Sequence, residues 1–583
     1  IPEDAGDEAV VAVSSKLFRC ACIRRWLPLV YREELYQVLQ LTGPLLLSRI
    51  LNFLLPFVIT IFCGHIGNAE LAGYALASAT INVTTTATGY GLAVACDTLI
   101  SQTFGSKNLK RVGVILQRGS LIMLLFCLPC WGLLINSYNL LLILHQEDEV
   151  ARIAHLYVMA FLPAVPVSAL TDYGFHVFLV CQGIILPQMY TAAAANVINL
   201  AANYVLIFSL ELGVVGSAIA NSLSQITICL LLFGYIRWKK LHQQTWGGWS
   251  TDCLQEWGTY MKLVIPSAFM VCFEWWIWEI GGFLAGVLGE VDLAAQHVMV
   301  EIGAITYMFP LGVHAAACVR VGNALGAGNT TRALVTCKVA LVLAGLLAVL
   351  QGIVITGSKS VIGYIFTSDE KIVALVSENF KVYIFLQFFD ALLCVCSGIL
   401  VGSGMQKIAA LSNLVGYYCI GLPVGIALMF FAELRILGFW VGLLVCVFFE
   451  TGFFLILIFK LNWKKVTQKA QLRAGKKVVM IPKRPISTVL TEAMVPDISD
   501  CNNTNSKNAS NTKPQLLLSV TQLILRRGLI FLILVLILVI GVAFHIAFPS
   551  PEPSAQRWAN LTLHWANDST PTPLVPLDLT PHL

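Results

Sequence analysis

The sequence predicts an all-α integral membrane protein with two six-helix bundles related by internal duplication, plus a thirteenth C-terminal transmembrane helix. Three observations predict this fold class: 57% of the 583 residues are hydrophobic and only 12% are charged, long apolar stretches recur, and short motifs repeat at one nearly fixed offset. Ordinary soluble domains contain about 25% charged residues, so this chain lacks the polar groups that a soluble surface needs. A soluble enzyme, a coiled coil and a disulfide-stapled secreted domain are therefore excluded.

Charge and cysteine content narrow the possible partners and chemistry. The 37 Lys+Arg and 32 Asp+Glu residues leave a net charge of +5, too small for a nucleic-acid footprint. Most of the 17 cysteines lie in apolar runs or basic flanks, which is typical of free thiols. Cys127 and Cys130 have the spacing of a redox pair, but a thiolate is unstable in the apolar stretch around them. Residues 1–33 contain no apolar core of a signal peptide.

Thirteen segments are apolar enough to be transmembrane helices, each of which needs about 20 residues. The twelve expected spans before Lys460 are residues 36–62, 71–96, 119–145, 150–180, 184–209, 212–236, 261–288, 292–319, 339–358, 379–401, 408–432 and 436–459, and the thirteenth is 528–548. The expected divisions are a cytosolic N-terminal segment (1–33), an N-lobe (34–240), a C-lobe (241–460), a disordered cytosolic loop (461–527), the thirteenth helix (528–548) and an extracellular tail (549–583).

Positive charges predict the orientation of these spans. Lys and Arg cluster before span one and after spans two, six and twelve, whereas several of the intervening loops carry acidic residues. Since Lys and Arg stay on the cytoplasmic side, we expect a cytosolic N-terminus and, after thirteen spans, an extracellular C-terminus in the cell membrane. Glycosylation sequons at Asn560 and Asn567 agree with an extracellular tail.

An internal repeat indicates that the first twelve spans are two copies of one unit. The segment Gly64–Ala72 recurs as Gly286–Ala294, and Pro44 recurs as Pro266 at the same offset. Gly105 recurs as Gly326 and Gly183 as Gly404, at an offset that is shorter by a single position. Six spans are an even number, so both halves enter the membrane in the same orientation. Parallel repeats of this kind surround a substrate cavity near the midplane, which a transporter needs and a receptor or scaffold does not.

Four carboxylates within the spans of the second half are the strongest candidates for function, because charges in the hydrocarbon region are costly. They are Glu274 and Glu279 in span seven, Glu301 in span eight and Asp390 in span ten. Structural ion pairs are the alternative, but Arg49 in span one is the only obvious deep cation. A carboxyl group in a low-dielectric cavity can exchange a proton near neutral pH and, when ionised, attracts an organic cation.

Neighbouring polar and aromatic residues are weaker candidates. Trp275, Trp276 and Trp278 offer faces for cation–π contact, although for at least one of them apolar packing is favoured. Asp97 is expected to form a loop salt bridge near Lys107 and Arg111, and Asn82 with Thr84–Thr86 to form helix–helix hydrogen bonds. Asp172 and His176 either relay protons or pair with each other, and Glu450 has no identifiable partner. His297 and His314 lack metal-ligand spacing, and no phosphate-binding or nucleophile motif is found, so we expect no metal, cofactor or catalytic residue.

Three longer motifs resemble the multidrug and toxin extrusion (MATE) family, vertebrate branch. They are ACDTLISQTFGS at 95–106, VRVGNALGAG at 319–328 and KKLHQQTWGGWS at 239–250. The similarity covers roughly residues 33–470 and includes the appended helix. It implies a proton-coupled antiporter that expels organic cations and xenobiotics across the cell membrane, apical in polarised cells, from a cavity between two six-helix lobes. No obligate protein partner is implied.

The resemblance also assigns residues. The family's proton-coupling and substrate-binding carboxylates fall on Glu274, Glu279, Glu301 and Asp390, the last of which is usually glutamate. Cavity positions fall on Trp275, Trp278, Tyr307, Asn82, Cys63 and Cys127. Arg49 replaces an uncharged residue usual in the family, and Asp172 adds a carboxylate. We therefore expect the substrate range of this chain to differ from that of the family. A flippase for a lipid-linked substrate and a non-transporting membrane scaffold are the alternatives; the acidic, aromatic span seven argues against the first, and the unpaired carboxylates argue against the second.

Overall fold

The computed structural model describes residues 27–365, 369–475 and 519–549, and every regular element in these ranges is a helix. Eleven helices are long and apolar enough to cross a membrane, or up to 12 when one bent helix pair counts as a single span. The predicted fold class is confirmed. Residues 1–26, most of the expected cytosolic loop, and the tail with its two sequons lie outside the described residues.

The N-lobe contains the first six predicted spans. Span four is bent by 57° between Phe161 and Ala164, where Pro163 lacks the backbone N–H that would continue the helical ladder. In chain order, the helices of the N-lobe are α3 (Leu29–Ile66), α4 (Asn68–Ile81), α5 (Ala87–Gly105), α6 (Leu109–Ile135), α7 (Ser137–Ile143), α8 (Asp148–Phe161), α9 (Ala164–Leu170), α10 (His176–Cys181), α11 (Leu186–Tyr204) and α12 (Gly213–Trp238). Span two therefore consists of α4 and α5, joined without interruption by a π-helical turn at Asn82–Thr86.

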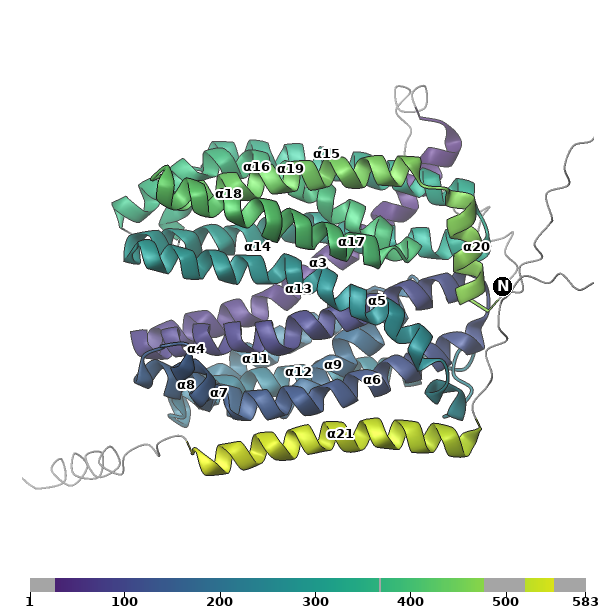
Figure 1. The fold of residues 1–583 in the computed structure, drawn as a ribbon, viewed down its shortest axis with the longest axis horizontal. Coiled ribbons are helices and arrows are strands. Elements are labelled where there is room, and N and C mark those ends of the chain that lie inside the picture. The colour runs from purple at the N-terminus through teal and green to yellow at the C-terminus, as the bar shows by residue number, and fades with distance from the viewer. Residues whose placement is uncertain (1–26, 366–368, 476–518, 550–583) are drawn as a thin grey trace, which may run out of the picture.

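The C-lobe contains spans seven to twelve. Its helices are α13 (Trp257–Leu288), α14 (Glu290–Ala327), α15 (Thr330–Ser358), α16 (Glu370–Ser403), α17 (Gln406–Asn413), α18 (Leu422–Ile426) and α19 (Ile436–Lys460). Side chains cap two helices at one end of the bundle: Asn329 accepts a hydrogen bond from the backbone of Arg332, and Asn462 accepts one from Lys465. The second cap starts the short helix α20 (Trp463–Arg473), which crosses that end of the bundle (Figure 1).

The two lobes repeat one architecture. Helix α14 begins at Glu290, which stands at the offset of the repeated segments from Asn68, the first residue of α4. It ends at Ala327, next to Gly326, the counterpart of the Gly105 that ends α5. The left-handed residues Gly183 and Gly404 end corresponding helices in the two lobes. A π-helical turn at Val205–Ser209 recurs at Ala427–Phe431, again at the repeat offset. The predicted internal duplication is therefore visible in helix boundaries and in local irregularities.

Each lobe has its own apolar core, and the lobes lie one above the other in Figure 1. Helix α5 is the main link between them, because it packs against α13 and α14 as well as against α6. Val94 of α5 even belongs to the core of the C-lobe. We call the end of the bundle that carries the basic residues of the α5–α6 connection, the end of α12 and helix α20 the basic end, and the opposite end the far end.

The thirteenth predicted span is helix α21 (Val520–Ala547), which packs along α6 on the outside of the N-lobe (Figure 1). Asn136 donates a hydrogen bond to the Gly541 carbonyl at 2.8 Å, and Gly132 lies against Gly541 so closely that a Cβ on Gly541 would overlap the α6 backbone. At the basic end the Arg527 guanidinium lies 4.4 Å from the centre of the Trp257 ring. The described part of α21 thus attaches to one side of the molecule, away from most of the C-lobe.

Candidate substrate and ion site

Three carboxylates from three helices of the C-lobe meet in its interior, and we call them the inner acidic group. Glu274 comes from α13, Asp390 from α16 and Glu450 from α19. Tyr307 of α14 donates a hydrogen bond of 2.8 Å to Oε1 of Glu274. Asp390 and Glu450 each lie within electrostatic reach of Glu274 and of each other. Two of the residues predicted to bind protons or substrate, together with Tyr307, are therefore brought together.

Glu450 is the member of this group that sequence reasoning did not place. Its side chain is only 4% exposed, its Oε2 atom accepts a long 3.9 Å contact from the Cys446 thiol, and its Oε1 atom has no hydrogen-bond partner among the described residues. A lone acid in the middle of an apolar helix was a visible signal. Its partners are distant in the chain, however, and only the packing of α13, α16 and α19 identifies them.

The inner acidic group has no nearby basic partner in the part of the chain that the structure describes. The groups that act on its three carboxylates are one another and the side chains of Tyr307, Ser412 and Cys446. An ionised carboxylate at this depth is strongly disfavoured when it has no counter-charge. The arrangement therefore favours carboxyl groups that are neutralised by bound protons or by a bound cation.

Glu279 and Glu301 lie apart from this group, nearer the far end. The exposed Glu279 lies near the Asn82 side chain of the N-lobe and near His297. Glu301 is half-buried and within electrostatic reach of Tyr74 in α4. These two acids thus lie near N-lobe side chains, nearer the far end than the inner acidic group.

The aromatic residues of span seven divide between two environments. Trp275 stacks on Tyr90 of α5 with ring centres 5.2 Å apart and an interplanar angle of 17°, so it lies at the boundary between the lobes. Trp278 packs on Trp440 of α19, inside the C-lobe. Of the two tryptophans predicted to line a cavity, Trp275 thus has its ring contact with the opposite lobe, and Trp278 has one with its own lobe.

The structure does not bring Cys63 and Cys127 to the carboxylates. Their side chains are 0% and 3% exposed and belong to the N-lobe core. A thiol enclosed in this way cannot contact a substrate unless the N-lobe itself rearranges. Both residues are better explained as packing groups of the N-lobe than as cavity residues.

The expectation that Asp97 forms a salt bridge with Lys107 or Arg111 is wrong. Arg111 pairs instead with Glu256 at 3.3 Å, and the charge that acts on Asp97 is that of Arg49 in α3. Asp97 lies two turns before the end of α5 and points between the lobes rather than into the loop. The side chain of Asp172 is outside the described residues, so its relation to His176 stays an open alternative.

Beyond Asp97, towards the basic end, the two lobes form a tight seam. Thr98 donates a hydrogen bond of 2.7 Å to the Val401 carbonyl of α16, and Gln102 donates one of 2.9 Å to the Gly402 carbonyl. Both α5 side chains are completely buried. Glycines permit the approach, because a Cβ on Gly326 of α14 would overlap the backbone oxygen of Gln102.

An ion network that sequence reasoning missed fastens the same end. Glu34 of α3 is 3% exposed and accepts two hydrogen bonds from the Arg320 guanidinium of α14, at 2.9 and 2.7 Å. It also accepts a bond of 2.8 Å from Thr336 and a longer one of 3.5 Å from Arg332. One buried carboxylate of the N-lobe is therefore held by three side chains of the C-lobe.

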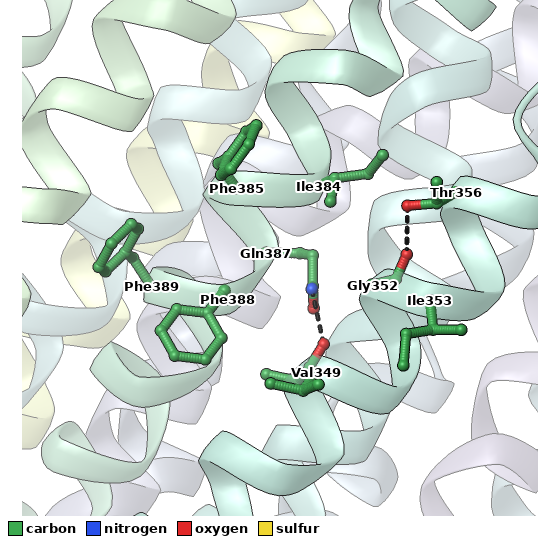
Figure 2. Close-up of a pocket in the computed structure, with 10 residues that line it drawn as sticks. Val349, Gly352, Ile353, Thr356, Ile384, Phe385, Gln387, Phe388 and Phe389 are labelled. Atoms are coloured by element: carbon green, nitrogen blue, oxygen red, sulfur yellow. Dashed lines mark hydrogen bonds between the residues drawn. The ribbon is translucent and has the colours of Figure 1, made fainter.

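A groove of about 430 Å³ lies elsewhere, between α15 and α16 on the outside of the C-lobe. Figure 2 shows Val349, Ile353, Phe385 and Phe388 around it, with Gln387 bonded to the main chain of α15. Several of these apolar side chains are at least half exposed. Its lining contains no acid, so it is not the candidate site and is a surface suited to contact with lipid.

Comparison with known proteins agrees with this geometry. The family model MatE matches residues 44–205 and 266–427, two segments that stand at the offset of the internal repeat. Multidrug and toxin extrusion protein 1 of Danio rerio is 47% identical and covers 92% of this chain and 95% of its own length. The protein of the same name from Homo sapiens is 44% identical, with 93% and 97% covered. Multidrug and toxin extrusion protein 2 of Mus musculus is 50% identical, with 76% and 78% covered.

Solved structures share the fold. A eukaryotic MATE transporter, AtDTX14, superposes with a TM-score of 0.73 at 28% identity, over 76% of this chain and 100% of its own. The Vibrio cholerae MATE transporter VcmN, in its bent form, gives a TM-score of 0.66 at 16% identity, over 76% and 100%. The two-lobed helical bundle is thus a known architecture of transport proteins.

Proposed function

Because this chain belongs to the MatE family of multidrug and toxin extrusion transporters, we propose that it exports organic cations in exchange for protons by alternating access. The observation that carries the proposal is the inner acidic group, which holds three carboxylates and no described basic residue. A group of this kind needs positive charge from outside the protein, and protons and organic cations both supply it. We infer no catalytic activity.

Competition for the same carboxylates couples the two fluxes. When Glu274 is ionised, it attracts a cation, and the Tyr307 hydroxyl at 2.8 Å holds the carboxylate in position. When a proton binds, the counter-charge is lost and the cation leaves. Asp390 and Glu450 extend the negative field, and Glu279 and Glu301 attract cations along the route to the far end. Trp275 offers an aromatic face at the boundary between the lobes.

The seam and the Glu34 network close the basic end, which we propose is cytoplasmic because Lys and Arg concentrate there. The N-terminus is then cytosolic and the C-terminus extracellular, in the cell membrane, with lobes at 34–240 and 241–460. The described conformation therefore corresponds to the state that releases substrate at the far end. Opening the seam is the step that admits substrate from the cytosol.

The experiment is uptake of radiolabelled tetraethylammonium by purified protein in proteoliposomes with an acidic lumen. A ten-fold proton gradient supplies about 1.4 kcal/mol per proton, and hence about ten-fold accumulation for a one-for-one exchange. Accumulation should disappear when a protonophore collapses the gradient, and Glu274→Gln should abolish it. Glu378→Gln is the matched control, because Glu378 is exposed on α16, the helix of Asp390. Accumulation by Glu274→Gln, or accumulation driven by sodium in the wild type, refutes proton antiport at this residue.

The alternative of a flippase for a lipid-linked substrate is less well supported. A lipid-linked phosphate needs a basic cavity, whereas the described carboxylates of the C-lobe interior make the site acidic. The same proteoliposomes discriminate the two functions, since a flippase translocates a fluorescent phospholipid or polyprenyl phosphate and does not accumulate tetraethylammonium. A scaffold does neither.

A further inference from the structure

Arg49 occupies an unusual place for a cation. It lies in the middle of α3, is half-buried, and forms no hydrogen bond or ion pair with another described residue. An Arg side chain at this depth is costly unless it has a counter-charge or reaches water. Arg49 therefore requires an explanation that ordinary packing does not give.

The surroundings of Arg49 are polar and come from both lobes. Asp97 and Tyr90 of α5, His176 of α10 and His314 of α14 all lie within electrostatic reach of its guanidinium. The Nδ1 atom of His314 is 2.8 Å from the Cys394 carbonyl, which fixes the ring at the boundary between the lobes. No salt bridge joins Arg49 to Asp97 among the described residues, so the two charges are near each other but not in contact.

These five residues keep part of their surface exposed, although they lie between the lobes. Each is half-buried, whereas Thr98, Ser101 and Gln102, the next polar residues of α5, are completely buried in the seam. Arg49 and its polar neighbours thus keep part of their surface exposed, whereas the polar side chains of the seam do not. Arg49 therefore lies outside the tightly packed seam.

The inner acidic group is the immediate neighbour of this centre. Tyr90 lies within electrostatic reach of Arg49 and stacks on Trp275, the residue next to Glu274 in the sequence. Cys394 of α16 lies within electrostatic reach of Tyr90 and of Glu274. A positive centre of the N-lobe thus lies near a negative centre of the C-lobe, and the stacked rings of Tyr90 and Trp275 lie beside both.

From this juxtaposition we infer that Arg49 forms a subsite for the carboxylate of zwitterionic substrates whose cationic group binds at Glu274. A guanidinium binds a carboxylate through two parallel N–H···O bonds, and the half-buried Arg49, without such a partner among the described residues, offers both. Flat aromatic zwitterions fit best, because the stacked pair Tyr90 and Trp275 lies beside both charged centres. The inference rests on the proposed function, since it adds a second charge to the same transported substrate.

The test compares two isosteric pyridinium compounds, N-methylnicotinamide and N-methylnicotinate, which differ in an amide against a carboxylate. Their uptake is measured in the proteoliposomes described above, and the ratio of zwitterion to cation uptake is the readout. Arg49→Gln should lower this ratio about ten-fold, equivalent to about 1.4 kcal/mol. Arg49→Lys keeps the charge and should keep most of the ratio.

Each outcome decides the inference. If the wild type accumulates the amide but neither accumulates nor is inhibited by the carboxylate, the carboxylate subsite is wrong and the proposed function stands. If it accumulates neither compound nor tetraethylammonium, the proposed function itself fails. An unchanged ratio in Arg49→Gln also refutes the inference. Should Arg49→Gln fold poorly, the inhibition of amide uptake by N-methylnicotinate in the wild type and in Arg49→Lys still decides it.

Discussion

Removing Glu34 should release the basic end of the molecule. Glu34 is 3% exposed, and Arg320, its bidentate partner, has a side chain that is 17% exposed. Breaking a buried ion pair by deleting one partner costs about 3–5 kcal/mol. The lower value applies here, because Arg320 and the more exposed Arg332 regain some water once the carboxylate is gone.

A loss of about 3 kcal/mol changes the equilibrium between the closed and open basic end by about 100-fold. If the open state makes up about 1% of the wild-type population, it rises to about half in Glu34→Ala. Glu34→Gln should give a smaller shift, since its amide oxygen still accepts a hydrogen bond from Thr336 or Arg320. The change should also slow transport, because the state that releases substrate at the far end is less populated.

The assay is a distance distribution between spin labels placed at Lys239 and Lys464, exposed residues of the two lobes at the basic end. Glu34→Ala should add a longer distance to the distribution. Glu33→Ala is the matched control, because Glu33 is the adjacent acid on the same helix and has no described ion-pair partner. Glu33→Ala should give the wild-type distribution. The reasoning is refuted if Glu34→Ala gives the wild-type distribution as well.

Other predictions concern the seam, the acids and the last helix. Gly326→Ala places a Cβ against the backbone of α5 and should lower uptake at least about ten-fold. The control Gly345→Ala, on an open face of α15, should change uptake less than two-fold (about 0.4 kcal/mol). Equal effects of the two substitutions contradict the role of the seam. Glu274→Asp withdraws the carboxylate by about 1.5 Å and should impair uptake more than Asp390→Glu at equal expression, and the reverse order means that the central acid is misassigned. Truncation before residue 520 should preserve uptake but lower the melting temperature, and complete inactivity of a folded truncated protein overturns that view.

Composition and spacing predicted the fold because the bilayer constrains it so strongly. Backbone groups in lipid must be satisfied within a helix, so apolar length alone located the spans. The repeated Gly64–Ala72 and Gly286–Ala294 segments then identified two equivalent lobes. Helix ends were less accurate: α14 extends from Glu290 to Ala327, well beyond the predicted 292–319, because it continues past the apolar zone to the seam and α20.

The candidate site was predicted only in part. The depth of a residue along a membrane-spanning helix can be estimated from the sequence, but the direction in which its side chain points cannot. Glu274 and Asp390 were recognisable as deep acids, and they do meet. Glu450 looked the same but had no partner until α13 and α19 were packed. Glu34 lies among other charges near the start of α3, so nothing marked it as buried. The direction in which a side chain points depends on helix rotation, which the polar patterning of nearly uniform apolar helices does not fix.

The π-helical turns that recur at equivalent places in the two lobes carry a record of descent. In such a turn the backbone hydrogen bonds join residues five apart instead of four, and turns of this kind are rare. The turn at Val205–Ser209 and its counterpart at Ala427–Phe431 therefore agree with a repeat unit that carried this irregularity before it was duplicated. The two lobes thus keep this irregularity in common although they differ elsewhere: the inner acidic group lies in the C-lobe, and Arg49 and the surface of α6 that contacts α21 lie in the N-lobe.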